Sequence, residues 1–290
     1  MRRHSSYQQQ DEGLFYEKYN INGKKAGNNL QIDHSASLLL ALRSHYSNKK
    51  IPKKHQQLIK DTANTICRIW KKDHFSEVIQ DLCEERFSFS DLKENFSYSL
   101  AACCKGLLSA NKLIPNRKWL DTANQMKATL LENSKNNFIR SFGKLKDENM
   151  DASLIALAWP FGIVRPKNRI MANTVKKMEN SIAKDYKVHR YEKDMYDGWM
   201  HKKLHRKKGA GYWPLLNFWF AIYYSKVNRK KALRYFNQVL TDLSSKYIPE
   251  QIFDNNIQVS VKPLAWSHAM FVIASAKLGY IAADYHNRKT

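Results

Sequence analysis

The 290-residue sequence predicts an all-α fold in which two kinds of helical segment alternate along the chain. The first kind is apolar on most sides and begins near residues 34, 95, 151, 212 and 263. The second kind has one apolar face and begins near residues 53, 117, 170 and 230. A helix that is apolar all round belongs in an interior, whereas a one-faced helix covers it. We therefore expect an inner ring of helices inside an outer ring, with an ordinary irregular helical bundle as the alternative.

The first half of the chain follows this alternation. Residues 1–30 are polar and rich in Gly, Asn and Lys, and we expect an irregular segment there, before a single domain over residues 31–290. Between Lys53 and Lys72, apolar residues recur at helical spacing, which predicts one buried face. The other predicted helical segments of this half are 36–42, 96–108 and 117–140.

The second half repeats the pattern. Asp151 precedes a dense apolar run and is predicted to cap it. Pro263 is predicted to open the last helix, because proline is favoured at the first helical position. No long segment shows the alternation of a strand. The predicted helical segments of this half are 152–159, 175–182, 212–224, 230–247 and 264–278.

Charge and cysteine usage restrict the class of protein. The net charge of +23 favours an anionic partner, such as nucleic acid, a membrane surface or a phosphorylated glycan, or else a solvated lysine surface. The four cysteines show no Cys-x-x-Cys spacing, which indicates buried free thiols in a reducing compartment. No apolar segment follows the basic N-terminus, and no apolar run is long enough to span a membrane. These features predict a cytoplasmic protein.

Carboxylates recur in the polar loops that precede the apolar segments. They are Asp33, Glu84, Glu85, Asp151, Asp194 and Glu250. In a two-layer ring these loops open on one face, where paired carboxylates suit acid and base chemistry on a neutral polyol. A helix N-cap is the alternative, and it fits Asp151 well. It fits Glu84 and Glu250 less well, because each lies about ten residues before its helix.

Six segments resemble, in the same order, the motifs of glycoside hydrolase family 15, the glucoamylase family. The Asp81–Arg86 segment is similar to the family's Asp-x-Trp-Glu-Glu-Arg, and Pro249-Glu250-Gln251 with Pro263–Ala269 is similar to its C-terminal motif. The others are Lys18–Gly23 with Leu30–Asp33, Asp151–Leu154, Arg190-Tyr191 with Asp194 and Tyr196, and Tyr212–Leu216.

This resemblance implies an (α/α)6 toroid and an inverting hydrolysis of terminal α-glucosidic bonds in α-glucans or oligosaccharides. Glu84 would be the general acid and Glu250 the general base, with their carboxyl groups about 6.5–9.5 Å apart. The substrate-binding residues that it implies are Asp33, Glu85, Arg190, Tyr191, Trp213 and Trp266. It implies no cofactor, and the scattered histidines predict no essential metal.

The chain departs from the family pattern at three places, one of them near Gly27, where the family has another tryptophan. Cys83 stands where the family has a tryptophan directly before the acid. The family's first helices, which carry an Arg-Asp pair for the terminal sugar, have no counterpart, so we expect about five hairpins and an incomplete ring. A natural truncation, a partial gene, or a split or dimeric assembly in which a partner chain completes the ring would each explain this. A non-catalytic relative, similar to the phosphorylase kinase regulatory subunits, is therefore an alternative. Nucleic-acid binding by the basic run His201–Lys208 is a third, and the same run could select acidic or phosphorylated sugars.

Overall fold

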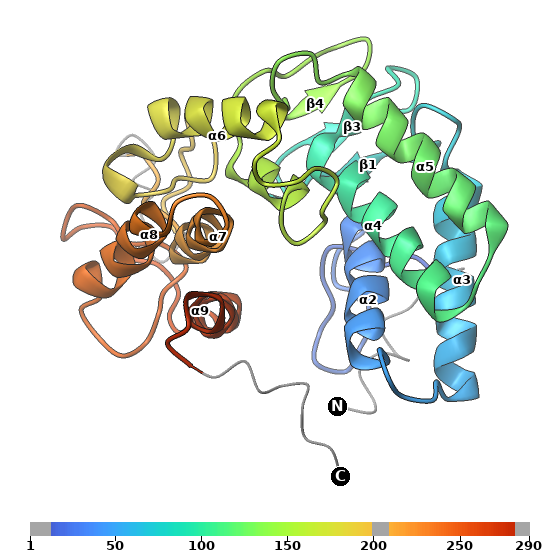
Figure 1. Cartoon of the computed structure of the whole chain (residues 1–290), viewed down its shortest axis with the longest axis horizontal. Coiled ribbons are helices and arrows are strands. Elements are labelled where there is room, and N and C mark those ends of the chain that lie inside the picture. The colour runs from blue at the N-terminus through green and yellow to red at the C-terminus, as the bar shows by residue number, and fades with distance from the viewer. Residues whose placement is uncertain (1–12, 199–208, 282–290) are drawn as a thin grey trace. The chain divides into compact units, whose positions relative to one another are not determined.

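The computed structural model describes residues 13–198 and 209–281, and the chain divides into two compact units (Figure 1). The first unit comprises residues 1–148 and the second comprises residues 149–290. Each unit is described by itself below. The predicted basic run, from His201 to Lys208, lies outside the described residues.

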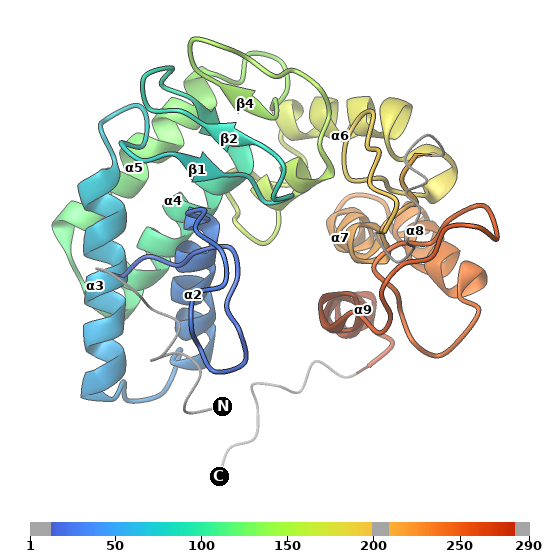
Figure 2. The ribbon, with the colours of Figure 1, turned by 180° about the vertical axis from the view of Figure 1, so that it is seen from behind.

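The described part of unit 1 is built on four α-helices. They are α2 (Ile32–His45), α3 (Lys53–Ile69), α4 (Ser97–Leu113) and α5 (Arg117–Glu132). Helix α4 packs against both α2 and α5, and it is buried along most of its length, as expected of an inner helix. The approach of α2 to α4 is close, because a Cβ at Gly106 would lie 2.9 Å from the Ala36 Cα. Figure 2 shows α3 and α5 together on the outer side of this pair.

Short strands hold the loops of unit 1. Strands β1 (Ile79–Gln80) and β2 (Phe87–Ser88) pair antiparallel, and so do β3 (Asn95–Phe96) and β4 (Ser141–Phe142). The sequence shows no sign of these strands, since an element of two residues cannot display a period-two pattern. The pairing of β1 with β2 closes the loop between Gln80 and Phe87, which carries the Glu-Glu pair.

Unit 2 contains α6 (Arg169–Ser181), α7 (Pro214–Ser225), α8 (Arg229–Asp242) and α9 (Ala265–Leu278), with the 3₁₀ helices η1 (Ala152–Leu157) and η2 (Lys184–Tyr186). Helix α7 is buried from Pro214 to Tyr224 and packs against α8, α9 and η1. Its one buried amide is satisfied, because Asn217 accepts from Val188 N and donates to the carbonyl oxygens of Tyr186 and Tyr235.

The structure corrects three details of the predicted helices. The inner segment after Asp151 is a short 3₁₀ helix, although Asp151 caps it as predicted by accepting from Ser153 N at 2.9 Å. Helix α9 begins at Ala265 and not at Pro263, because Leu264 still has extended backbone angles. That helix is also less enclosed than its composition suggests, since Trp266, Val272 and Ile273 are exposed.

Candidate active site

The loop that carries the Glu-Glu pair is closed by its own first and last residues. The Asp81 carboxylate accepts from the backbone N–H groups of Glu85 and Arg86, at 3.0 and 3.2 Å, and forms a 2.6 Å ion pair with the Arg86 guanidinium. Asp81 is buried, so these bonds are sheltered from water. The loop therefore has one strongly favoured conformation, with Glu84 and Glu85 at its tip.

Glu84 occupies a left-handed backbone conformation, with φ of 58°, and its side chain is 36% exposed. Non-glycine residues rarely adopt this conformation, and such strain is often found at functional sites. One Glu84 oxygen lies 2.8 Å from the Lys18 Nζ, and the hydrogen bond to Glu84 raises the pKa of Lys18. This contact joins two of the segments that the sequence singled out. It must open before that oxygen can reach a substrate.

Asp33 lies in the first turn of α2, behind the Glu-Glu loop. Its side chain is buried, and desolvation raises the pKa of the carboxyl to about 6. The adjacent Gln31 donates to the Asp81 carbonyl oxygen at 3.1 Å, which ties the start of α2 to this loop. Within the described part of the chain, Asp33 Oδ1, Gln31 Oε1 and Gln80 Oε1 are buried without a hydrogen-bond partner. Such atoms are rare in folded proteins, and they point to a polar ligand or water.

In unit 2, Arg190 is held by a carboxylate and by three aromatic rings. Asp194 receives two of its N–H groups, at 2.7 and 2.8 Å, and both side chains are buried. The guanidinium carbon lies 5.0 Å from the Tyr191 ring centroid, 4.8 Å from that of Tyr196 and 4.9 Å from that of Trp213. Cation–π attraction and a paired charge make this a rigid assembly.

Glu250 lies beside this assembly, on the loop that leads to α9. The loop is fixed to the helix, because His268 Nε2 accepts from Ile248 N at 3.0 Å and Ser267 Oγ donates to the Pro249 carbonyl at 3.0 Å. Ser260 Oγ donates to a Glu250 oxygen at 3.4 Å. The Tyr196 hydroxyl is also hydrogen-bonded to Glu250, and burial together with the Glu250 charge raises the pKa of Tyr196 to about 12. Tyr196 therefore remains a proton donor to this carboxylate at neutral pH.

Unpartnered polar atoms occur beside Glu250 as well. Gln251 accepts from Gly211 N at 2.9 Å through Oε1, but its Nε2 is buried without a partner among the described residues. The same holds for Trp213 Nε1. Among the described residues of unit 2, both such atoms therefore lie at predicted motif residues.

The structure groups most of the predicted site residues within their own units. Asp33 lies behind the loop of Glu84 and Glu85, and Arg190, Tyr191 and Trp213 gather beside Glu250. Trp266 instead contacts Trp219 edge-on, at 6.0 Å between ring centroids, and is 41% exposed. Because Glu84 and Glu250 belong to different units, their predicted separation stays a prediction.

Sequence reasoning missed several residues that build the site. They are Gln31, Asp81, Tyr196 and Gln251. All four lie inside the quoted motifs, so their position in a motif was the available signal. The sequence could not show what these side chains do in the fold. Some of them fix loops by hydrogen bonds, and others keep a hydrogen-bond donor or acceptor available to a ligand.

Among residues 13–198 and 209–281, no three His, Cys, Asp or Glu side chains are grouped as a metal site would require. No helix in these ranges is both long and apolar enough to cross a membrane.

Comparison with known proteins gives the class and then the family. The chain superposes on a glycosidase with a TM-score of 0.75 and 19% identity, over 94% of this chain and 74% of the other. It also superposes on a bacterial glucoamylase solved with acarbose, with a TM-score of 0.70 and 20% identity, over 92% of this chain and 44% of the other. These likenesses show the fold and confirm the predicted helical architecture. The sequence model of glycosyl hydrolases family 15 matches residues 2–276, so the chain belongs to that family.

A relative with a similar sequence is also described as a glycosyl hydrolase. An uncharacterized glycosyl hydrolase of Methanocaldococcus jannaschii is 26% identical over 298 aligned residues, which cover 91% of this chain. The alignment covers 45% of that relative, so the chain spans about half the length of the protein it matches.

Proposed function

We propose that this chain acts as a glucoamylase-like glycoside hydrolase, which inverts the anomeric carbon as it cleaves terminal α-glucosidic bonds. Family membership supports a glycosidase. The observation that carries the proposal is the set of buried polar atoms without partners. Among the described residues, those of the proposed site lie at Gln31, Asp33 and Gln80 in unit 1 and at Trp213 and Gln251 in unit 2, while Trp70, Asn95 and Ser99 carry the others. Sugar hydroxyls, which both donate and accept, are suitable partners for such a mixed set.

The two glutamates would divide the reaction. Glu84 donates a proton to the leaving glycosidic oxygen, while Glu250 takes a proton from the attacking water. An inverting reaction needs the two carboxyl groups about 6.5–9.5 Å apart, with the water between Glu250 and the sugar. The contacts of Glu250 with Tyr196 and Ser260 suit the base, since two donors orient its carboxylate.

The remaining residues would bind the substrate. Asp33 and Glu85 would accept hydrogen bonds from sugar hydroxyls, and a neutral Asp33 carboxyl would also donate one. Arg190 holds the faces of Tyr191 and Trp213 in place, so these rings present fixed apolar surfaces. Solved relatives are consistent with this substrate class, because a variant of the superposed glycosidase was solved in complex with glucose.

The test is the release of glucose from maltooligosaccharides, with the anomer followed by proton NMR. We expect β-glucose as the first product. Glu84→Gln and Glu250→Gln should each lower kcat by about 10²–10⁴-fold, which is the usual contribution of a positioned acid or base. The matched controls are Glu77→Gln and Glu148→Gln, which change the same charge at exposed positions. No release at high enzyme concentration, or equal loss in the controls, would refute the proposal.

A second candidate function is sugar binding without turnover. The observation that favours it is the ion pair between Lys18 and Glu84, which occupies the proposed acid. Under this function, maltooligosaccharides bind to the protein, but no glucose is released. Lys18→Ala separates the two functions, because it frees the Glu84 carboxyl. A rise in kcat would support the hydrolase, and binding with no turnover in Lys18→Ala would support the binder.

A further inference from the structure

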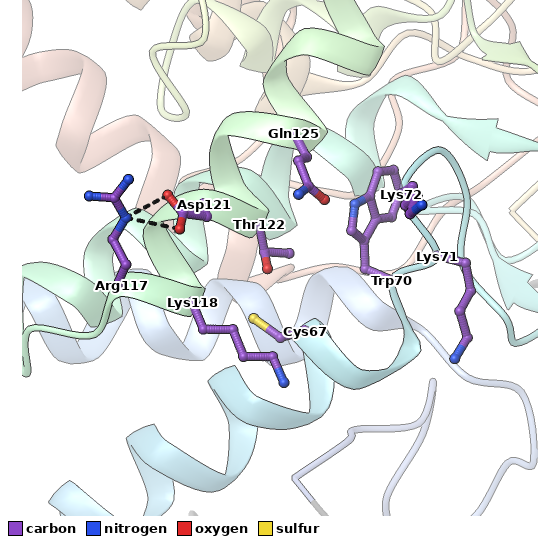
Figure 3. Close-up of a pocket in the computed structure, with 9 residues that line it drawn as sticks. All are labelled: Cys67, Trp70, Lys71, Lys72, Arg117, Lys118, Asp121, Thr122 and Gln125. Carbon is purple, nitrogen blue, oxygen red and sulfur yellow. Dashed lines mark hydrogen bonds and ion pairs between the residues drawn. The ribbon is translucent and has the colours of Figure 1, made fainter.

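Unit 1 has an open groove of about 710 Å³ that plays no part in the proposed reaction. It lies where the end of α3 meets the first turns of α5, as Figure 3 shows. We call it the basic groove, after the four cationic side chains that line it. They are Lys71, Lys72, Arg117 and Lys118. The Glu84 loop and Asp33 are not among its lining residues.

The positive charge of the basic groove exceeds its negative charge. Arg117 is neutralised by Asp121, whose two oxygens each lie 2.9 Å from the Arg117 Nε. Lys72 and Lys118 form no ion pair with any residue in the described ranges, and the Lys71 ammonium group contacts only the Arg68 carbonyl oxygen there, at 3.4 Å. Three ammonium groups therefore line the groove without a counter-ion among the described residues, and an anion between them would lower their mutual repulsion.

The position of two of these cations on their helix is also unfavourable. Arg117 and Lys118 are the first two residues of α5, a 16-residue helix capped by Asn116. The positive end of a helix dipole repels cations and attracts anions, and its first N–H groups have no intrahelical acceptor. A phosphate placed here would be stabilised by the lysines and by the helix end together.

The floor of the basic groove carries polar groups suited to hydroxyls. Trp70 is 6% exposed, and its Nε1 is buried without a hydrogen-bond partner among the described residues. In Figure 3 the nitrogen-bearing edge of this indole faces the side of the groove where Thr122 and Gln125 lie. Burial raises the pKa of the Cys67 thiol, so Cys67 contributes an uncharged wall.

We propose that the basic groove binds a sugar phosphate. Its phosphate lies among Lys71, Lys72 and Lys118, and its hydroxyls meet Gln125 and the Trp70 N–H. The volume lies within the range of about 300–1,000 Å³ that small-ligand sites occupy, which is more than a lone phosphate ion needs. This proposal is independent of the hydrolase activity, because the groove shares no residue with Glu84, Glu250 or their neighbours.

The test is isothermal titration calorimetry of the whole chain at fixed ionic strength, with glucose 6-phosphate, glucose and inorganic phosphate as the three probes. We expect saturable binding of glucose 6-phosphate, weaker binding of inorganic phosphate and none of glucose. Replacing Lys72 and Lys118 together by Ala should lower the affinity for glucose 6-phosphate by about tenfold or more, because bonds to charged groups are being removed. Trp70→Phe should lower the affinity for glucose 6-phosphate but leave the affinity for inorganic phosphate unchanged.

The control is the double variant Lys53→Ala and Lys60→Ala, which removes the same charge from exposed positions of α3. We expect its affinity for glucose 6-phosphate to match that of the parent chain. Equal losses in the two double variants would overturn the proposal, since only net charge would then matter. It would also be overturned by an absence of binding, or by inorganic phosphate binding as tightly as glucose 6-phosphate.

Discussion

Replacing Asp33 by Asn should stabilise the protein at neutral pH while it impairs sugar binding. Asp33 is fully desolvated at the start of α2, and one of its oxygens has no partner among the described residues. The negative charge of Asp81 adds to the raised pKa, whereas the neighbouring His34 opposes it. The ionised carboxylate is therefore a cost to the folded state, and an amide of nearly the same shape avoids it.

The size of this effect follows from the pKa, which rises from 3.8 to about 6. The folded state then binds more protons than the unfolded state between pH ~4 and ~6, so stability falls as pH rises through this window. At about 1.4 kcal/mol per pKa unit, the full cost above pH ~6 is about 3 kcal/mol. Asp33→Asn should regain up to that amount at pH 7 and nothing below pH ~4, where the native carboxyl is neutral.

The assay is urea unfolding of the parent chain and Asp33→Asn at several pH values between 4 and 8. Asp91→Asn is the control, because it removes the same charge from an exposed position in the same unit. We expect the free energy of unfolding of Asp33→Asn to depart from that of the parent chain as pH rises. The free energy of unfolding of Asp91→Asn should follow that of the parent chain at every pH. A variant that is less stable than the parent at pH 7, or equally shifted at pH 4 and 8, would refute the reasoning.

Two further predictions concern the assembly around Arg190. Asp194→Asn should cost about 3–5 kcal/mol of folding free energy in denaturant unfolding, because it removes the carboxylate charge that pairs with the buried Arg190, whereas Asp121→Asn in the exposed pair with Arg117 should cost less than about 1 kcal/mol. Similar costs for both would contradict the burial argument. Tyr196→Phe should lower kcat on maltooligosaccharides by about tenfold at nearly constant KM, since a donor to Glu250 is lost. The exposed Tyr247→Phe should leave kcat unchanged, and an unchanged kcat in Tyr196→Phe would exclude this role.

The helices were predictable because burial leaves a direct pattern in the sequence. Helix α7 reads as apolar throughout and is buried throughout, and α3 shows the one buried face that its spacing predicts. The short strands and the 3₁₀ form of η1 were not predictable, because they depend on a few backbone hydrogen bonds and not on a periodic pattern. The exposed face of α9 was missed for a similar reason, since composition shows what a helix can bury but not what covers it.

The candidate site was predictable in its residue types but not in its contacts. The sequence singles out Glu84 and Glu250, yet nothing in it shows that Lys18 lies against the first or that Tyr196 lies against the second. These contacts join segments that are far apart along the chain, so they follow from the tertiary fold. Trp266 packs edge-on against Trp219 of α7 and is partly exposed, so its predicted contact with a sugar stays a prediction.

Each unit holds its proposed catalytic glutamate on a loop that hydrogen bonds fix in place. This feature helps to decide between the hydrolase function and sugar binding without turnover. In unit 1, Asp81 fixes a loop with Glu84 at its tip, and in unit 2 the start of α9 fixes a loop that carries Glu250. Sugar binding alone would explain the unpartnered polar atoms behind these loops, because hydroxyls would satisfy them. It would not require Glu84 in a left-handed conformation, which costs about 1–3 kcal/mol, nor two donors on the Glu250 carboxylate. A Glu84→Gly change should therefore relieve strain and make unit 1 more stable than Glu84→Gln does, and equal stabilities of the two variants would contradict the strain.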